Sequence, residues 1–289
     1  MLTLPTPPES AIQALVSCAL SEDIGQGDLT AGLIDNNNEA TARLVCKEHA
    51  ILCGVPWFEE ACRQVDSKLQ VEWFYAEGEK MESGAEVCLI TGRARAILTV
   101  ERTAINLLQT LSGTATVTAR YAGVIAGTNT QILDTRKTIP GMRLAQKYAV
   151  SVGGGKNHRI GLFDGILIKE NHIAAAGSIK HAVARAREAI KDAPHCQLLE
   201  VEVESLDQLK EAIAAGVTRI MLDNFDLADM ERAVVINQDL TGGTTELEVS
   251  GNVELDGLRA IAQTGVDYVS IGALTKHIQA TDFSLRMVE

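Results

Sequence analysis

The strongest constraint on the fold is a regular alternation that begins at Gln131, where short apolar runs are each followed by a stretch with helical periodicity. The apolar runs are Gln131–Leu133, Gly165–Ile168, Leu198–Val203, Arg219–Leu222, Glu246–Val249 and Tyr268–Ile271. The helical stretches are Gly141–Val152, Ser178–Lys191, Leu206–Ala215, Leu227–Ile236 and Leu255–Thr264. Strands and helices that alternate at this length predict a parallel sheet joined by right-handed crossovers.

A polar or small residue closes almost every apolar run. These residues are Asp134, Lys169, Glu202, Asp223, Ser250 and Gly272. An open doubly wound sheet would gather ligands at one switch point, whereas a barrel opens all strand ends on one face. Candidates on six strands therefore favour a barrel. Six strands, with a seventh that we place near Tyr148–Val152, fall short of eight. We predict an α/β fold with an incomplete, about seven-stranded parallel barrel.

The chain before this alternation has a mixed pattern that predicts a separate domain with antiparallel strands. The elements expected there are a helix from Ala11, a strand over Thr41–Val45, a helix over Val55–Val65 and a strand over Gln70–Tyr75. A long helical pattern follows, either one helix or two that are broken at Ser112-Gly113. We expect the first domain over residues 1–112 and the barrel over 113–274.

A cationic stretch lies between Thr135 and Phe163 in an otherwise acidic chain. The formal net charge is -12, yet this interval holds no Asp or Glu. Glycines and a proline interrupt the charges, so an anionic small ligand explains them better than a solvated helix face. The acidic total argues against nucleic acid or an anionic membrane as a partner. The basic residues are Arg136, Lys137, Arg143, Lys147, Lys156, His158 and Arg159.

Several of these side chains suggest particular chemistry. Arg136 and Lys137 follow a buried strand directly, and two adjacent cations there fit a bound carboxylate or phosphate. Lys169 can act either as a Schiff-base nucleophile or as an anion clamp, and the neighbouring cations favour the clamp. His158 and His172 can each be a general acid, a ligand donor or a structural residue.

Two carboxylates, Glu202 and Asp223, end consecutive strands. Such a pair can hold sugar hydroxyls or a magnesium ion, or serve as acid and base. The alternation alone leaves open the choice among Glu200, Glu202 and Glu204. Small residues after the last two strands can present backbone N–H groups to a phosphate. These residues are Ser250, Gly251, Asn252, Ile271, Gly272 and Ala273.

The cysteines and the hydropathy suggest where the protein works. None of the six cysteines forms a Cys-x-x-Cys pair, so we expect reduced core thiols and a cytoplasmic protein. The N-terminus shows no signal-peptide pattern. No apolar run approaches the ~20 residues that span a bilayer, so we expect no membrane partner.

Taken together, the motifs resemble those of the quinolinate phosphoribosyltransferase family, also called carboxylating nicotinate-nucleotide pyrophosphorylases. The likeness runs nearly end to end and begins at Glu22-Asp23. The further motifs are Gly27-Asp28-Leu29-Thr30, Glu101-Arg102-Thr103-Ala104, Ser112-Gly113-Thr114-Ala115-Thr116, Asp134-Thr135-Arg136-Lys137-Thr138, Asn157-His158-Arg159, Lys169-Glu170-Asn171-His172, Glu200-Val201-Glu202-Val203, Leu222-Asp223-Asn224 and Ser250-Gly251-Asn252. Several ordered motifs in one chain are a specific signal.

The resemblance implies a pentosyltransferase that moves phosphoribosyl from phosphoribosyl pyrophosphate to quinolinate and decarboxylates the product. It would yield nicotinate mononucleotide, pyrophosphate and CO2 for de novo NAD biosynthesis, with Mg2+ as cofactor. The implied fold is an N-terminal α/β sandwich, to which residues 275–289 return, followed by the incomplete barrel. The implied assembly is a homodimer or larger homo-oligomer, in which the partner's N-terminal domain completes each active site.

The resemblance also implies a role for each candidate residue. Arg102 is the arginine donated across the dimer interface, and Lys169, Glu202 and Asp223 are catalytic. Glu202 and Asp223 hold the ribose and the metal, a choice that rests on the likeness alone. The residues implied around the quinolinate carboxylates are Arg136, His158, Arg159 and Lys169. Those implied for the phosphate-rich substrate are Lys137, His172, Ser250, Gly251, Asn252, Gly272 and Ala273, and Thr135 and Ile271 complete the substrate-binding set.

Two other functions fit some of the same features. An aldolase-like barrel would use Lys169 as a Schiff-base lysine and would trap a carbonyl substrate under borohydride. A non-catalytic dicarboxylate sensor would bind quinolinate without consuming phosphoribosyl pyrophosphate. A related molybdenum-associated family shares the implied fold, so the fold alone does not choose the substrate.

Overall fold

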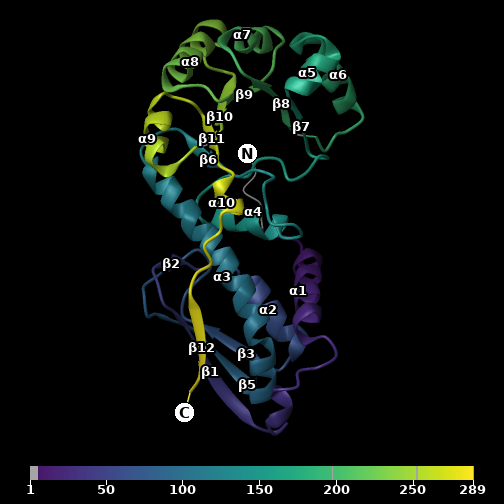
Figure 1. Cartoon of the computed structure of the whole chain (residues 1–289), viewed down its shortest axis with the longest axis vertical. Helices are drawn as coiled ribbons and strands as arrows, with labels where there is room; N and C mark the ends of the chain where they lie inside the picture. The colour runs from purple at the N-terminus through teal and green to yellow at the C-terminus, as the bar shows by residue number, and fades with distance from the viewer. Residues whose placement is uncertain (1–5, 197, 252, 289) are drawn as a thin grey trace. The chain divides into compact units, whose positions relative to one another are not determined.

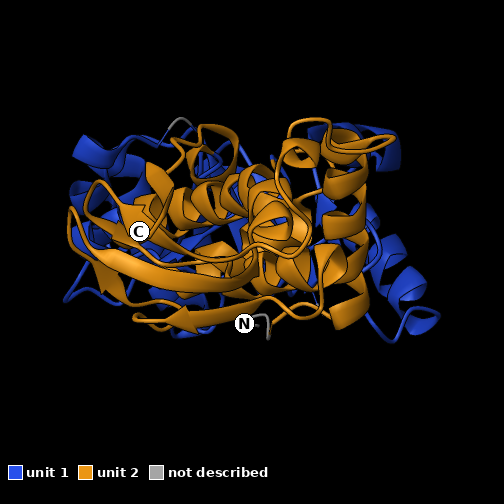
Figure 2. Ribbon diagram, turned by 90° about the horizontal axis from the view of Figure 1, so that it is seen from below, with its two compact units in different colours: residues 1, 120–137, 155–272 blue, residues 2–119, 138–154, 273–289 orange. Residues whose placement is uncertain are grey.

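The computed structural model describes residues 6–196, 198–251 and 253–288, and the chain forms two compact units (Figure 2). The first unit holds Arg120–Lys137 and Gly155–Gly272. The second holds the chain up to Ala119, together with Thr138–Gly154 and the part from Ala273 onward. The chain therefore passes between the units several times, and the single domain boundary expected near residue 112 stays a prediction.

The first unit contains a six-stranded parallel sheet in the order β6-β11-β10-β9-β8-β7 (Figure 1). Its strands are β6 (Gln131–Leu133), β7 (Gly165–Ile168), β8 (Leu198–Val203), β9 (Arg219–Asp223), β10 (Glu246–Ser250) and β11 (Tyr268–Ser270). The predicted fold class, a parallel barrel-type sheet beside a separate N-terminal α/β domain, is confirmed.

One predicted strand is wrong. Residues Tyr148–Val152 lie in the helix α4 (Arg143–Val152), because the helical period of this stretch outweighs its short apolar run. The additional parallel partner of β6 is instead a single bridge between Leu133 and Lys156. This bridge adds one short parallel pairing next to β6, in addition to the six strands of the sheet.

The helices of the first unit lie around the outer side of its sheet in Figure 1. Three of them begin at side-chain caps, because Ser178, Ser205 and Asp226 accept a hydrogen bond from a backbone N–H of the first turn. The helix α5 follows β7 and was not predicted. The helices are α5 (Glu170–Ala176), α6 (Ile179–Lys191), α7 (Leu206–Ala214), α8 (Leu227–Thr241) and α9 (Leu255–Gln263).

The second unit is built on a four-stranded antiparallel sheet in the order β12-β1-β5-β3, with the two-stranded sheet β2-β4. The strands are β1 (Glu39–Cys46), β2 (Ala50–Ile51), β3 (Gln70–Trp73), β4 (Lys80–Met81), β5 (Glu86–Arg93) and β12 (Phe283–Met287). The last strand pairs with the first one in the register Leu44↔Leu285. The C-terminal tail therefore pairs with the sheet of the second unit, as the family likeness implies.

The helices of the second unit include α3. It runs without a break through Ser112-Gly113, so the long helical pattern in the sequence forms one helix and not two. The predicted helix α2 begins after Gly54, and both oxygens of Glu77 accept the N–H groups of Gly54 and Val55 at 2.9 and 3.1 Å. Those bonds satisfy two donors at the helix start. The helical segments are α1 (Glu9–Ile24), η1 (Ala31–Leu33), α2 (Val55–Val65), α3 (Ala94–Val124, ending in the first unit), α4 and α10 (Ala273–Lys276).

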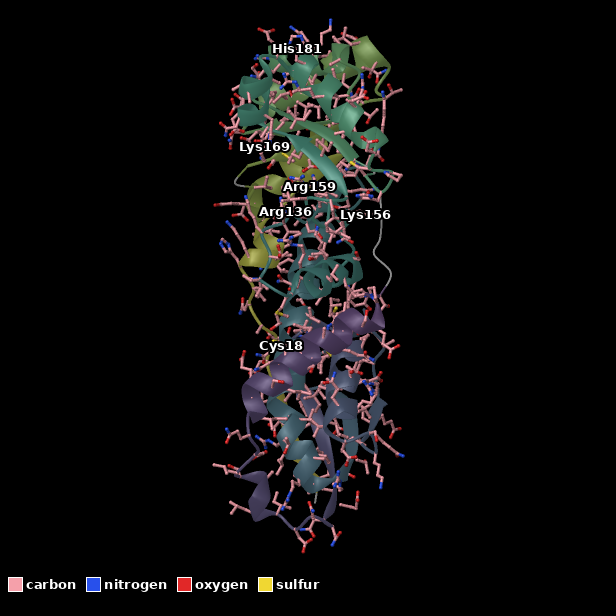
Figure 3. The ribbon with its side chains drawn as sticks, turned by 90° about the vertical axis from the view of Figure 1, so that its right-hand side faces the viewer. Cys18, Arg136, Lys156, Arg159, Lys169 and His181 are labelled. Carbon is pink, nitrogen blue, oxygen red and sulfur yellow. The ribbon has the colours of Figure 1, made fainter. Side chains whose placement is uncertain are left out.

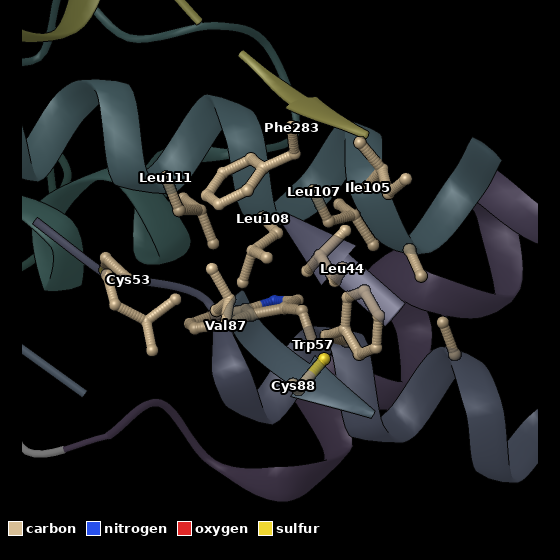
Figure 4. Packing of buried hydrophobic residues seen from close by; sticks show 14 of the residues in the cluster. Leu44, Cys53, Trp57, Val87, Cys88, Ile105, Leu107, Leu108, Leu111 and Phe283 are labelled. Atoms are coloured by element: carbon tan, nitrogen blue, oxygen red, sulfur yellow. The ribbon is translucent and has the colours of Figure 1, made fainter. Parts of the chain in front are cut away.

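The apolar core of the second unit packs α3 against the antiparallel sheet and α2 (Figure 4). Leu108 and Leu111 on α3 are fully buried, as are Leu44 on β1 and Trp57 on α2. The rings of Trp57 and Tyr148 lie 5.5 Å apart, a tilted contact that adds to the area they bury. Within the described residues, no helix is both long and apolar enough to span a membrane.

Candidate active site

The ladder register determines which side chains face the same side of the six-stranded sheet. Paired residues in a parallel ladder share a face, and side chains alternate along each strand. Glu202 pairs with Met221, and Asp223, two residues further along β9, pairs with Ser250. Glu202, Asp223 and Ser250 therefore lie on one face, near the C-terminal ends of three consecutive strands. The register therefore places the two predicted carboxylates at the same edge of the sheet.

Lys169 and Glu202 form an ion pair at this edge. Lys169 comes directly after β7, and its Nζ donates to Oε2 of Glu202 on the neighbouring strand β8. The side chain of Lys169 remains 43% exposed, so a ligand can reach the ammonium group. An ammonium held by a carboxylate is a poor nucleophile, which argues against the Schiff-base alternative.

A pair of arginines lies beside this edge. Arg159 donates from Nη1 to the carbonyl oxygen of Gly165 at 2.9 Å, which ties it to the start of β7. Burial, and then the nearby positive charge of Arg136, lower the pKa of Arg159. Arg136 and Arg159 are therefore close enough to repel each other (Figure 3). Two partly buried guanidinium groups near each other are suited to a ligand with more than one carboxylate.

Asp134 fixes the backbone that carries these arginines. It is fully buried, and its Oδ2 accepts from Asn157 Nδ2 at 2.6 Å while its Oδ1 accepts from the backbone N–H of His158 at 2.9 Å. These bonds join the end of β6 to the segment that holds Arg159. Sequence reasoning named Asp134 only as a residue that follows a strand, and the structure assigns it this anchoring role.

The ends of β6 and β11 approach each other closely. A Cβ atom added at Gly272 would lie 2.9 Å from Cδ of Lys137 and 3.6 Å from Oγ1 of Thr135. The backbone N–H of Lys137 donates to Oγ1 of Thr135 at 3.0 Å, which shapes this turn. Glycine at position 272 therefore leaves room for a ligand beside the Lys137 side chain. The backbone N–H of Ile271 is already used, because it donates to Leu133.

A second close approach lies at the ends of β9 and β10. Gly251 has a φ of 107°, and a Cβ atom there would collide with Oδ1 of Asn224. Asn224 itself has a positive φ of 56°, and its side chain donates to Oδ2 of Asp223 at 2.7 Å. The loops after β9 and β10 therefore pack closely together beside Ser250, and glycine at position 251 makes this approach possible. Asn252, which was predicted to belong to the same phosphate-binding set as Gly251, lies outside the described residues.

The structure does not bring every predicted residue into the first unit. Arg102 is exposed on α3, and Ala273 begins α10, and both belong to the second unit. The cations Arg143 and Lys147 of the basic stretch lie on α4, also in the second unit. His172 is exposed on α5, where its Nδ1 accepts from the backbone N–H of Lys169 at 3.0 Å.

Sequence reasoning named His158 and considered Glu200, but it missed Glu248, which forms a buried group with them below the strand ends. Nε2 of His158 lies 2.9 Å from Oε2 of Glu200 and 3.6 Å from Oε2 of Glu248. Both carboxyl groups are completely buried, and this burial raises the pKa of each. The sequence signal for Glu248 was its alternation with Ser250 along β10, which places both on one face.

The burial of Glu248 predicts a pH-dependent stability. Burial and the charge of Glu200 raise its pKa to about 8, against opposing effects of His158, Ser270 and Arg219. Because the folded state holds this proton more tightly, its contribution to stability is complete below pH 4.5 and is lost as the pH rises towards 8. Relative to the parent, Glu248→Gln should gain stability over this range, by up to about 1.4 kcal/mol per pH unit.

Denaturant unfolding of both proteins at several pH values between the ordinary and the raised pKa of Glu248 measures this difference. Glu211→Gln on the exposed side of α7 removes the same charge at the surface and is the matched control. A stability difference between the Glu248→Gln variant and its parent that stays constant with pH would contradict the prediction.

Comparison with known proteins gives a consistent result along the whole chain. Residues 114–286 match the family described as "Quinolinate phosphoribosyl transferase, C-terminal domain", and residues 28–112 match the corresponding N-terminal domain. A Bacillus subtilis relative named "Probable nicotinate-nucleotide pyrophosphorylase [carboxylating]" is 40% identical over 274 residues, which cover 95% of this chain and 92% of the relative.

An Arabidopsis thaliana relative, the chloroplastic nicotinate-nucleotide pyrophosphorylase [carboxylating], is 39% identical over 98% of this chain and 84% of its own length. Among solved structures, the nicotinate-nucleotide pyrophosphorylase from Francisella tularensis superposes with a TM-score of 0.91 at 47% identity. That match covers 97% of both chains. Sequence and structure comparisons therefore point to the same group of proteins.

Proposed function

The chain belongs to the quinolinate phosphoribosyltransferase family, and we propose that the edge formed by the barrel strand ends is its active site. The reaction transfers phosphoribosyl from phosphoribosyl pyrophosphate to quinolinate with decarboxylation, and gives nicotinate mononucleotide, pyrophosphate and CO2 for de novo NAD biosynthesis. The observation that carries the proposal is the arginine pair beside the Lys169–Glu202 ion pair at this edge.

Quinolinate is the ligand that best matches the arginine pair. Its two adjacent carboxylates form a compact dianion, and Arg136 and Arg159 are two cations close enough for the charge of Arg136 to help lower the pKa of Arg159. A bound dianion relieves the repulsion between these cations, so binding is favoured beyond the direct hydrogen bonds. Lys169 adds a third, partly exposed cation on the neighbouring element.

The phosphoribosyl substrate fits the other strand ends. The space beside Gly272 and Lys137 can take phosphate oxygens next to an ammonium group, and the turn at Gly251 offers a second glycine approach. Glu202 and Asp223 lie on one face of the same sheet, near the ends of β8 and β9. We assign them to the ribose, where positive charge develops as pyrophosphate departs.

The chemistry then follows from charge. The ring nitrogen of quinolinate attacks the anomeric carbon while the bond to pyrophosphate breaks, and the carboxylates of Glu202 and Asp223 stabilise the cationic sugar. Lys137 can neutralise part of the charge on the leaving pyrophosphate. The bond between the ring carbon and the carboxylate next to the quaternised nitrogen then breaks, and CO2 leaves. The electron pair of that bond stays on the ring carbon, where the adjacent positive charge stabilises it, and a proton then adds to this carbon.

Magnesium is the proposed cofactor, and Glu202 and Asp223 are its proposed protein ligands. The ion is commonly held by one or two carboxylates together with substrate phosphates and water. Two carboxylates at the ends of neighbouring strands, beside the proposed phosphate space, fit that coordination. When bound, the ion would screen the negative charge of the pyrophosphate group.

We further propose a homodimer or larger homo-oligomer in which Arg102 of one subunit completes the active site of another. Arg102 is exposed on α3 and belongs to a different compact unit from Arg136, Arg159 and Lys169. An exposed arginine is suited to bind a carboxylate across an interface. A cytoplasmic location is a separate proposal, supported by buried thiols such as Cys62, whose pKa burial raises to about 12.

A product assay tests the proposed function. With phosphoribosyl pyrophosphate and Mg2+, the protein should convert quinolinate to nicotinate mononucleotide and CO2, and should convert nicotinate and nicotinamide at least about 100-fold more slowly. The reason is that nicotinate has one carboxylate fewer than quinolinate and nicotinamide two fewer, so each offers less negative charge to Arg136 and Arg159. Carbon-14 in the 2-carboxyl group of quinolinate reports decarboxylation directly.

Each alternative function predicts another result. Equal use of nicotinate without CO2 release would show a different substrate. Binding of quinolinate with no consumption of phosphoribosyl pyrophosphate would favour the sensor. A borohydride-stable adduct on Lys169 would favour the aldolase-like enzyme.

A further inference from the structure

The interior below the proposed active site is charged, which is unusual for a barrel. Ladder pairing places Glu200 opposite Arg219 and Glu248 opposite Met221, on the same face as Glu202. Glu200 and Glu248 are both completely buried. Barrel interiors are generally filled by branched apolar side chains, and buried carboxylates destabilise a fold unless other groups compensate them. The side chains that contact these carboxylates therefore indicate what they do.

The nearest contact is the ring of His158. The backbone N–H of Arg159 donates to Nδ1 of His158 at 2.7 Å, so this nitrogen is an acceptor and carries no hydrogen. The hydrogen of the neutral ring must then lie on Nε2, which donates to Oε2 of Glu200 at 2.9 Å. Both ring nitrogens are therefore engaged within the protein, one with the backbone of Arg159 and the other with the buried carboxylate.

The same hydrogen-bond pattern argues against a metal ion at this cluster. His158, Glu200 and Glu248 each offer one ligand atom, and these atoms lie within 4.8 Å of one another. A histidine nitrogen that binds a metal must carry no hydrogen. Because Nδ1 already accepts a hydrogen bond, Nε2 is the nitrogen with the hydrogen, and it points at the carboxylates. The cluster is better described as a hydrogen-bond network.

Glu248 is the third member of this network, and the hydrogen bonding of its buried carboxyl group needs an explanation. Both of its carboxyl oxygens and Oε1 of Glu200 are buried without a hydrogen-bond partner among the described protein atoms. One proton on Glu248 that is donated to Glu200 would satisfy an oxygen of each group at once. The raised pKa of Glu248 is consistent with that protonated form. Glu200 would then accept from both Glu248 and His158.

We propose that Glu248 and Glu200 are positioning residues for quinolinate binding, which hold His158 in place and, through its Nδ1, the backbone of Arg159. This inference rests on the proposed function. The connection is short: carboxyl oxygens of Glu248 and Glu200 lie within 4.8 Å of each other, Glu200 accepts from Nε2 of His158, and Nδ1 of His158 accepts from the backbone N–H of Arg159. Arg159 in turn is the guanidinium that faces Arg136. Loosening this connection should weaken quinolinate binding more than the binding of phosphoribosyl pyrophosphate.

Two substitutions at one position test the proposal. Glu248→Gln keeps the shape and can donate an N–H to Glu200, whereas Glu248→Leu keeps the approximate volume and removes the donor. We expect Glu248→Leu to raise the Kd and KM for quinolinate roughly 10- to 100-fold, with a smaller change in kcat, because a small displacement of a binding group is costly. Glu248→Gln should stay within about threefold of the parent, and calorimetry should give an unchanged Kd for phosphoribosyl pyrophosphate in both.

The parent protein offers a second, independent readout. Nitrogen-15 NMR of labelled histidine, with His158 assigned by the signal lost in His158→Asn, should show a neutral ring with its hydrogen on Nε2. The opposite tautomer would overturn the proposal, and this measurement holds even if Glu248→Leu fails to fold. Equal quinolinate affinity of the Gln and Leu variants, or equal weakening of both substrates, would also overturn it. Failure of the parent to bind quinolinate would instead refute the proposed function.

Discussion

Arg136→Ala is expected to lower kcat/KM for quinolinate roughly 100- to 1,000-fold while leaving the thermal stability nearly unchanged. A fall of this size in kcat/KM is expected because the substitution removes the cation from a charge-assisted contact that is shielded from water. A carboxylate of the ligand then has no cation to pair with. The stability is expected to change little, because Arg136 lies after the end of β6 and is only partly buried. Steady-state rates with quinolinate varied, together with a thermal melt, measure both effects.

Two further variants make this result specific. Arg136→Lys keeps the charge but not the planar fork of donors, so its activity should lie between those of the parent and the alanine variant. Arg232→Ala removes an arginine that pairs with Asp229 on the exposed side of α8, and it should leave the rate unchanged. Near-normal activity of Arg136→Ala would remove Arg136 from the site and count strongly against the proposed arrangement.

Much of the barrel could be predicted from the sequence because its strands are buried. Strands of a parallel sheet that are covered on both faces read as short apolar runs, and β7 and β8 agree with the prediction at both ends. The site edge followed from the same pattern, since parallel strands bring their C-terminal ends together. Glu202 and Asp223 were therefore expected from the sequence to lie near each other, because each ends a strand of the same parallel sheet.

Other features depend on contacts that no local pattern contains. The alternation of β10 shows that Glu248 and Ser250 share a face, but it cannot distinguish a barrel interior from solvent. The orientation of His158 depends on bonds to Arg159 and to Glu200, which lies on another strand. The helix α4 was predicted as an element, while its place in the second unit is set by tertiary packing. Sequence reasoning therefore found the edge formed by the strand ends and missed the network beneath it.

The largest gain of activity is expected from mixing two inactive variants, Arg102→Ala and Lys169→Ala. Each homo-oligomer should be nearly inactive, because Lys169→Ala removes the cation paired with Glu202 and Arg102→Ala removes the arginine proposed to reach a partner's site. If subunits exchange at random in a dimer, half of the dimers are hybrids, and each hybrid holds one site with both intact residues. Activity should therefore recover to about a quarter of the parent value.

A second mixture separates a shared site from a simple mixing artefact. Lys137 and Lys169 both belong to the first compact unit, so a mixture of Lys137→Ala and Lys169→Ala subunits should remain inactive. Native mass spectrometry of differently tagged subunits can confirm that exchange has occurred in both mixtures. Absence of recovery after confirmed exchange would contradict the shared site, because Arg102 would then act within its own chain or not at all. Recovery in both mixtures would place Lys137 and Lys169 in different active sites, which a single edge of strand ends does not allow.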